Sequence, residues 1–231
     1  MDMLTGDRIT AARLADWRKL AQGLHARYVV ADLAAGARFV GAITEAVEGV
    51  GEHLRATLGD GYVDLKLISQ DAVYHDGEGH EHVVEWVTQV DVDLARRITG
   101  IAAQQGARPE VSAITSVELA LDTAHGDAIG RFWSALLTGD DAARGRGTIG
   151  NDVRDAAGRV PYLWFQETDE HETPRQRFHL DVFVPRDHAE QRIAAALAAG
   201  GVVASKNPEY TILADQDGNQ ACVSTSLPPA H

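Results

Sequence analysis

The stretch that decides the fold of the first half of the chain is residues 80–98, HEHVVEWVTQVDVDLARRI. Its first part alternates along the chain as a strand does, and one face is formed by His80, His82, Val84 and Trp86. A helix is then expected from about Val90 to Gln104, because Leu94, Ile98 and Ile101 recur at helical spacing. A strand therefore leads directly into a helix.

Upstream of this stretch, two helices and a strand are expected. Asp7 to about Gln22 has apolar residues at helical spacing, and His25–Val30 follows as a short strand. Asp32 is a good N-cap for a second helix. Gly49 and Gly51 weaken its end, so the backbone is expected to leave helical geometry near residues 52–54.

A hairpin is expected between the second helix and residue 86. Residues 63–67 alternate apolar and polar, and residues 76–79 (DGEG) supply the turn before the return strand. The first hundred residues then follow the order α-β-α-β-β-α. The polar segment QQGARP at 104–109 ends this region, so we predict a first domain over 1–106, a linker over 107–112 and a second domain over 113–231.

The second domain reads as one pattern that occurs twice. A strand, a helix and a strand are expected at 116–122, 126–137 and 160–168. A strand at 178–185, a helix at 187–199 and two strands at 210–214 and 220–226 are then expected. Strand, helix and strands repeated with an offset of about 60 residues indicate an internal repeat. The fold class is therefore α+β in both domains.

Composition excludes several classes of partner. The chain of 231 residues has 34 acidic and 21 basic residues, a formal charge of -13, which disfavours nucleic acid and anionic membranes. With a single cysteine, no internal disulfide can form. The sequence has no apolar run long enough for a membrane span and no signal peptide, so a cytoplasmic protein is expected.

The first domain resembles the pterin-4a-carbinolamine (4a-hydroxytetrahydrobiopterin) dehydratases. The residues that carry the resemblance, over about 4–105, are Glu48 and His53 at a helix end and the phrase Thr88-Gln89-Val90-Asp91 before the last helix. Glu52 stands where the family has its first histidine, and Leu54 replaces a proline. The family fold implied is an antiparallel sheet layered with helices.

The resemblance implies a hydro-lyase that uses histidines as general acid and base, since groups that titrate near neutrality do this best. It places the third histidine at His82, although His80 or Trp86 takes that position after a register change. The implied catalytic residues are His53, His82 and Glu52, the last only if burial raises its pKa. The implied substrate-binding residues are Glu48, His80, Trp86 and Asp91.

The second domain resembles the vicinal oxygen chelate superfamily, which includes the glyoxalase-like and bleomycin-resistance-like proteins. RFW at 131–133, WFQ at 164–166, RFHLDV at 177–182 and LADQDGNQACV at 213–223 carry the resemblance, over about 113–227. It implies two paired βαβββ modules. A small-molecule pocket is implied beside His179, Glu118, Trp133 and Trp164.

Metal-using members of that superfamily bind a divalent ion through His and Glu side chains. His179 matches the middle ligand, the first ligand falls on Ser116 with Glu118 two residues along, and the third falls on Cys222. One matching ligand does not make a metal site, so no cofactor is expected, and Glu118, His179 and Cys222 are conditional ligands.

The favoured hypothesis is a pterin-4a-carbinolamine dehydratase-like lyase with an appended glyoxalase-like small-molecule-binding domain. Two alternatives stay open: a non-catalytic binding or assembly protein with two degenerate domains, and a metal-dependent glyoxalase or dioxygenase activity in the second domain. Both resemblances also imply a homodimer or a higher homo-oligomer.

Overall fold

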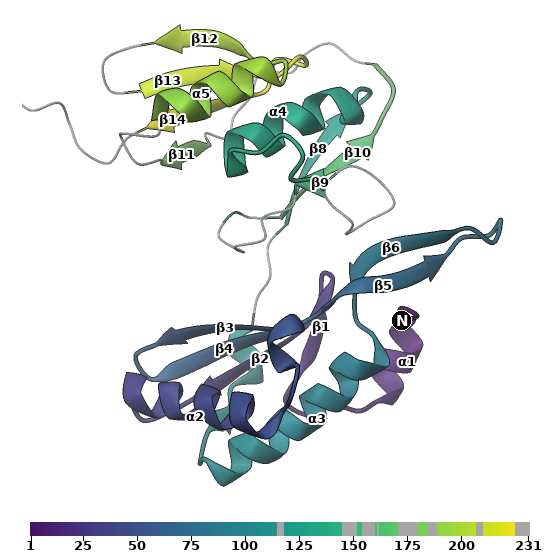
Figure 1. The fold of residues 1–231 in the computed structure, drawn as a ribbon, viewed down its shortest axis with the longest axis vertical. Helices are drawn as coiled ribbons and strands as arrows, with labels where there is room; N and C mark the ends of the chain where they lie inside the picture. Colours follow the sequence, from purple (N-terminus) through teal and green to yellow (C-terminus); the bar gives the residue numbers. More distant parts are fainter. Residues whose placement is uncertain are drawn as a thin grey trace, which may run out of the picture. The chain divides into compact units, whose positions relative to one another are not determined.

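The computed structural model describes residues 1–114, 118–144, 152–153, 160, 162–170, 180–183, 189–206 and 210–224. The chain divides into two compact units, Met1–Ser116 and Val117–His231. Each unit is α+β, as the sequence predicted (Figure 1). In the described part of the chain, every helix is too short or too polar to cross a membrane.

The first unit is built on an antiparallel sheet in the order β1-β2-β4-β3, with β7 also paired to β2. The strands are β1 (Arg18–Leu20), β2 (Gly23–Val29), β3 (Leu54–Gly59), β4 (Tyr62–Leu67) and β7 (Arg108–Pro109). The helices α2 (Leu33–Ala46) and α3 (Gln89–Gln104) cover one face, and a hairpin of β5 (Ser69–His75) and β6 (Glu81–Trp86) projects beyond the sheet (Figure 1).

The core of the first unit lies between the sheet and the two helices. Alternate residues of β2 and β4 are buried, because a strand turns successive side chains to opposite faces. The buried sheet residues are Leu24, Ala26, Tyr28, Val63, Leu65 and Leu67. Phe39 and Ile43 of α2 and Ile98 of α3 belong to the same apolar cluster. This shared core holds α3 against the sheet.

The expected helix over 7–22 is shorter in the structure. Only α1 (Gly6–Ala11) forms, and Arg13 has a left-handed φ of 50°. Trp17 is buried and its Nε1 donates a hydrogen bond of 3.2 Å to Thr99 Oγ1 of α3. This contact is distant in sequence, and it favours an extended backbone leading into β1 over further helical turns.

The second helix begins as predicted and ends early. Asp32 caps α2 by accepting a hydrogen bond of 2.7 Å from Ala35 N. The helix ends at Ala46, and Gly49 takes a left-handed φ of 72°. A short 3-10 helix, η1 (Val50–Glu52), then leads to His53.

Two hairpins replace the single hairpin that we expected. Strand β3 was missed, and it pairs with β4 from Leu54↔Leu67 to Gly59↔Tyr62. The turn at 76–80 closes the second hairpin, β5–β6. The segment expected as a linker belongs to the first unit, because Ala107 is buried in its core, β7 pairs with β2, and a 3-10 helix η2 (Val111–Ala113) follows.

The second unit contains the predicted repeat. Its first module is β8 (Glu118–Thr123), α4 (Gly126–Thr138), β9 (Asp152–Val153) and β10 (Tyr162–Glu167). Its second module is β11 (Asp181–Phe183), α5 (Ala189–Ala198), β12 (Val202–Lys206), β13 (Tyr210–Ala214) and β14 (Gln220–Ser224). In both modules the first strand pairs in parallel with the last, and β12 is a strand that the sequence did not predict.

Candidate functional site

A buried polar cluster lies where three elements of the first unit meet. Its members are His53 after η1, Ser69 at the start of β5, Thr88 at the N-cap of α3, and Asp91 in the first turn of α3. Ser69, Thr88 and Asp91 are at most 1% exposed, and the His53 side chain is 12% exposed. His53 therefore connects the cluster to the surface.

Asp91 is the centre of this cluster. Its Oδ2 accepts hydrogen bonds from Thr88 N at 2.7 Å, Thr88 Oγ1 at 3.1 Å and Ser69 Oγ at 2.7 Å. Its Oδ1 lies 3.0 Å from His53 Nδ1. The bonds to Thr88 form a capping box, which satisfies free N–H groups at the start of α3. One carboxylate therefore caps a helix and holds an imidazole.

These contacts assign the tautomer of His53. An ionised carboxylate only accepts hydrogen bonds, so the Nδ1 that faces Asp91 carries the proton and donates it. Ser69 Oγ lies 3.2 Å from the same Nδ1. The Nε2 of His53 then has a lone pair that can accept a proton, and Asp91 stabilises the imidazolium that forms. This arrangement suits proton transfer.

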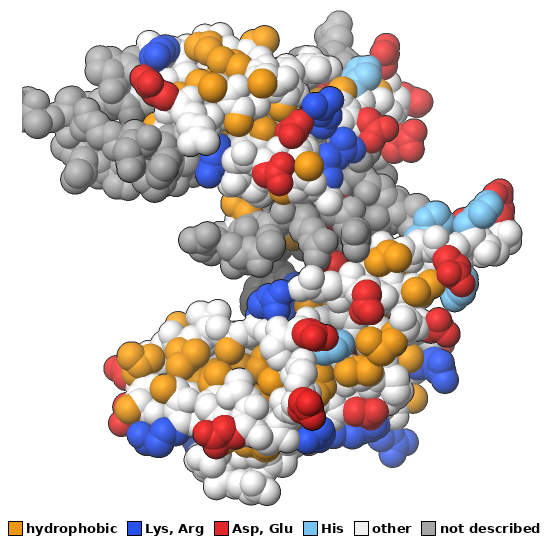
Figure 2. Space-filling model, in the orientation of Figure 1, with side chains coloured by type: hydrophobic (Ala, Val, Ile, Leu, Met, Phe, Trp, Pro, Cys, Tyr) orange, Lys and Arg blue, Asp and Glu red, His pale blue; other side chains and the backbone are white. Residues whose placement is uncertain are grey.

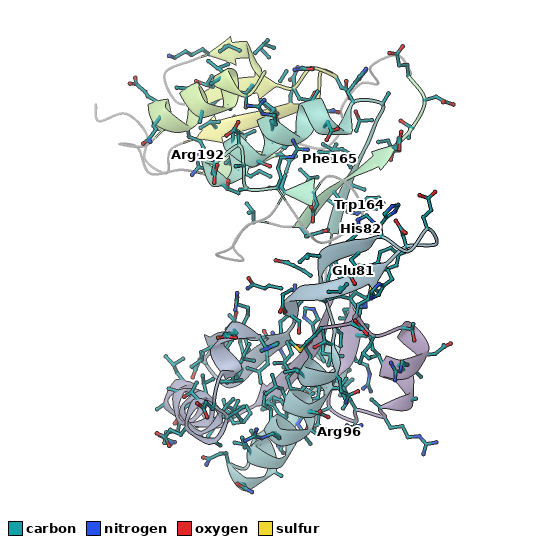
Figure 3. The ribbon with its side chains drawn as sticks, turned by 45° about the vertical axis from the view of Figure 1, so that its right-hand side comes forward. Glu81, His82, Arg96, Trp164, Phe165 and Arg192 are labelled. Carbon is teal, nitrogen blue, oxygen red and sulfur yellow. The ribbon has the colours of Figure 1, made fainter. Side chains whose placement is uncertain are left out.

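The second expected histidine lies elsewhere. His82 is paired with Tyr74 in the β5–β6 hairpin, five residues along β5 from Ser69. At about 3.3 Å per residue, this is on the order of 16 Å of strand. Figure 3 shows Glu81 and His82 on the projecting hairpin, away from α3 where Arg96 lies. Within this chain the structure does not bring His53 and His82 together.

His82 takes part in a different group of charged residues at the hairpin tip. Its Nε2 lies 2.9 Å from Asp76 Oδ2, and His80 Nδ1 lies 3.2 Å from the same oxygen. The hydrogen bond with His82 holds the pKa of Asp76 well below its usual range. Figure 2 shows the histidines and carboxylates gathered at this tip. His80 and His82 therefore lie around a carboxylate of their own hairpin.

Two further expectations for the first unit need correction. Asp91 is fully buried, so it orients His53 rather than touching a substrate. Glu52 is exposed, so the burial that would adapt it to acid catalysis is absent. Glu48 is also exposed, beyond the end of α2.

Trp86 is the expected substrate-binding residue that lies beside the cluster, because it is paired with Ser69 in the β5–β6 register. Its Nε1 donates a hydrogen bond of 2.9 Å to Leu4 O, and Lys19 Nζ lies 3.8 Å from the ring centroid. These contacts fix the half-buried ring at the base of the hairpin.

In the second unit, the residues expected to line a pocket differ in burial, and two of their side chains lie outside the described part of the chain. Trp133 is 1% exposed, and its Nε1 donates a hydrogen bond of 2.9 Å to Asp215 Oδ2, so it is a core residue and not a stacking surface. Trp164 is partly exposed on β10. His179 and the side chain of Glu118 lie outside the described residues.

The conditional metal site gains no support from the described part of the chain. Cys222 is 2% exposed in β14, where it is paired with Asp181 and Ile212. Among the described residues, no group of three His, Cys, Asp or Glu side chains could hold a metal ion.

A histidine that the sequence analysis missed lies at the start of α4. His125 Nδ1 is 2.9 Å from Asp217 Oδ1, and its Nε2 is 3.6 Å from Glu170 Oε1. The hydrogen bond with Asp217 raises the pKa of His125. His125 and Asp217 are 92 residues apart, so sequence spacing gave no signal of this contact.

Comparison with known proteins confirms the character of the second unit. Residues 118–224 match the family model described as a glyoxalase-like domain. The second unit is therefore glyoxalase-like, as its sequence predicted. No curated protein matches the sequence.

Several solved structures are similar to parts of the chain. A glyoxalase/bleomycin resistance protein from Albidiferax ferrireducens T118 has 18% identity over 49% of this chain and 98% of its own, with a TM-score of 0.38. The fosfomycin resistance protein FosX from Mesorhizobium loti has 9% identity over 49% and 92%, also at 0.38. A transcriptional coactivator/pterin dehydratase from Brucella melitensis has 21% identity over 44% and 99%, at 0.33. The dehydratase resemblance of the first unit stays a prediction.

Proposed function

We propose that the first unit is a general acid–base catalyst that dehydrates a pterin-type carbinolamine with a single imidazole, that of His53. The observation that carries the proposal is the hydrogen bond of 3.0 Å between His53 Nδ1 and the buried carboxylate of Asp91. It fixes the tautomer that leaves Nε2 as a base. The motif residues Glu48, His53 and Thr88–Asp91 supply the substrate class.

One imidazole is sufficient for a balanced reaction. His53 Nε2 takes the proton from the ring nitrogen of the carbinolamine, and the ring becomes imidazolium. The same Nε2–H then protonates the departing hydroxyl, which leaves as water, and a C=N bond forms. No net proton is gained or lost, and Asp91 stabilises the transient positive charge.

The decisive test compares two histidines. We expect purified protein to dehydrate a pterin 4a-carbinolamine, and His53→Ala to lower the rate about 10²–10⁴-fold, the usual contribution of general acid–base catalysis. His82→Ala, on the distant part of the hairpin, should change the rate less than about threefold, and His75→Ala is the control for an exposed histidine. An equal loss from His53→Ala and His82→Ala would reject the single-imidazole mechanism.

The same assay tests the non-catalytic alternative. If wild-type protein shows no turnover above the uncatalysed rate, the first unit is a binding or assembly module that has kept the fold without the activity. For the second unit we propose small-molecule binding without a metal, with the partly exposed Trp164 as a contact. Quenching of tryptophan fluorescence that disappears in Trp164→Phe would support this role.

A further inference from the structure

A buried hydroxyl group, that of Ser69, touches every other member of the polar cluster around His53. Ser69 is the first residue of β5 and is 0% exposed. Its Oγ lies 2.7 Å from Asp91 Oδ2, 2.8 Å from Thr88 Oγ1 and 3.2 Å from His53 Nδ1. A hydroxyl group has one hydrogen to donate and two lone pairs that accept. The three neighbours therefore match its full hydrogen-bonding capacity.

The carboxylate of Asp91 sets the direction of these hydrogen bonds. An ionised carboxylate only accepts, so Ser69 donates its hydrogen to Asp91 Oδ2. A lone pair of Ser69 Oγ is then left to face the Nδ1–H group of His53, whose other acceptor is Asp91 Oδ1 at 3.0 Å. The Nδ1–H group therefore lies between two acceptor oxygens that are themselves joined by a hydrogen bond.

The main chain holds Ser69 against His53. Beyond the end of the β3–β4 ladder, Ile68 N donates a hydrogen bond of 3.1 Å to His53 O. Ser69 is the next residue, so the hydroxyl group begins one residue from this backbone contact. On the other side, Ser69 is paired with Trp86 of β6. The contact between hydroxyl and imidazole is therefore supported by backbone pairing on both sides of Ser69.

The geometry gives Ser69 no direct role in chemistry. It is fully buried, and it faces Nδ1, the nitrogen that already carries a proton, whereas a nucleophile must face the basic nitrogen. Its effect is on the orientation of His53. A ring turned by 180° about its Cβ–Cγ bond would place a carbon where Nδ1 lies, and the bonds to Ser69 and Asp91 would both be lost. The two acceptors together keep Nε2 turned away from the cluster.

We propose that Ser69 is a positioning residue for proton transfer at His53. Its oxygen is the second acceptor that holds the Nδ1–H group, and its hydrogen holds Asp91 in the orientation in which Oδ1 faces the imidazole. This inference rests on the proposed function of the first unit, because a positioned base matters only for a reaction at Nε2. Poor orientation of a catalytic group lowers the rate of reaction of bound substrate and leaves binding unchanged.

Ser69→Ala removes the hydroxyl group and leaves the rest of the cluster paired. Thr88 N and Oγ1 still donate to Asp91 Oδ2, and His53 still donates to Oδ1. The helix cap and the charge of the cluster therefore stay the same. Ser112→Ala is the matched control, because Ser112 is exposed and its hydroxyl group bonds to Glu110 Oε1 at 2.7 Å.

Proton NMR of the full chain tests the positioning role without any substrate. The Nδ1–H proton of His53, assigned by its loss in His53→Ala, exchanges with water only when the ring leaves its acceptors. One hydrogen bond has a net effect of about fivefold on such an equilibrium. We expect this proton to exchange about fivefold faster in Ser69→Ala and at the wild-type rate in Ser112→Ala. Wild-type exchange in Ser69→Ala would overturn the proposal.

Turnover of a pterin 4a-carbinolamine is the second test. We expect Ser69→Ala to lower kcat about fivefold or more, with KM within about twofold of wild type, since the hydroxyl group touches no substrate. Ser69→Cys keeps the size of the side chain but forms only weak hydrogen bonds, so it should behave as Ser69→Ala does. Ser69→Thr keeps the hydroxyl group and should retain kcat within about twofold. A higher KM with unchanged kcat would overturn the proposal, and so would wild-type kcat in both Ser69→Ala and Ser69→Cys.

The two tests separate this inference from the proposed function. If the wild type shows no turnover while Ser69→Ala still speeds the exchange of the Nδ1–H proton, the dehydratase function is rejected and Ser69 still orients the imidazole. If the wild type is active and Ser69→Ala equals it in kcat and in proton exchange, the positioning role is rejected and the function stands. Native amide spectra establish that each variant is folded.

Discussion

Asp91→Asn should destabilise the first unit much more than its conservative chemistry suggests. Asp91 is fully buried, and both of its oxygens accept hydrogen bonds. An amide keeps one acceptor oxygen and replaces the other with an N–H group that faces donors. The start of α3 and the imidazole of His53 therefore compete for a single oxygen.

The size of the effect follows from the hydrogen bonds that the amide cannot accept. A capping interaction contributes about 1 kcal/mol, and a buried donor left without a partner costs about 1–3 kcal/mol. We therefore expect the free energy of unfolding of the first unit to fall by about 2–4 kcal/mol. Asp93→Asn is the matched control on the same helix, because Asp93 is exposed and its ion pair with Arg96 lies at the surface, where such pairs contribute about 0–1 kcal/mol.

Hydrogen exchange in increasing urea, read by mass spectrometry on peptides from residues 62–104, measures this quantity for the first unit by itself. We expect opening free energies in α3 to fall for Asp91→Asn and to stay within about 0.5 kcal/mol of wild type for Asp93→Asn. Equal effects of the two variants would refute the reasoning, because Asp91 would then contribute no more than a surface carboxylate.

Three further predictions concern other parts of the chain. The pKa of His25 is about 4 in the folded state and about 6.5 in the unfolded state, so the free energy of unfolding of the first unit should fall by up to about 3 kcal/mol between pH 6.5 and pH 4. Urea titrations at each pH measure this fall, and His25→Gln should remove it. Trp133→Phe should destabilise the second unit by about 1–3 kcal/mol in chemical denaturation, because buried Asp215 loses a donor; a change below about 0.5 kcal/mol would contradict this. Gly201→Ala should destabilise the second unit by about 1–3 kcal/mol, because a Cβ atom there overlaps the ring of Phe132 in α4. Gly100→Ala should stabilise α3 by about 0.5–1 kcal/mol, because a Cβ atom there meets no described atom within 4 Å. Thermal melts that rank the two variants in the opposite order would contradict both expectations.

The sequence predicted the elements whose signals are local. The Asp32 cap depends on an amide three residues away, and the start of α3 depends on the spacing of Thr88 and Asp91. The repeat in the second unit was visible for the same reason: β8 and α4 of the first module are followed, about 60 residues later, by β11 and α5 of the second. Each of these signals lies within one helical turn or one module.

Contacts between distant residues account for what the sequence did not show. Within the segment 7–22, which was expected to be one helix, Trp17 forms a hydrogen bond with Thr99, 82 residues away. Ser69 has no motif around it, yet its hydroxyl group bonds to Asp91. The family resemblance identified His82 but could not show that the β5–β6 hairpin carries it away from His53.

The double attachment of Asp91 has a consequence for how such a chain could change over time. A mutation that abolished proton transfer at the imidazole would leave the helix cap in place, whereas loss of the carboxylate would endanger the whole unit. A chain of this fold without catalytic activity would therefore still carry an aspartate here, because the start of α3 needs it as a cap. An aspartate at this position therefore indicates that the start of α3 is capped. Whether the unit is active must be judged from the histidine beside it.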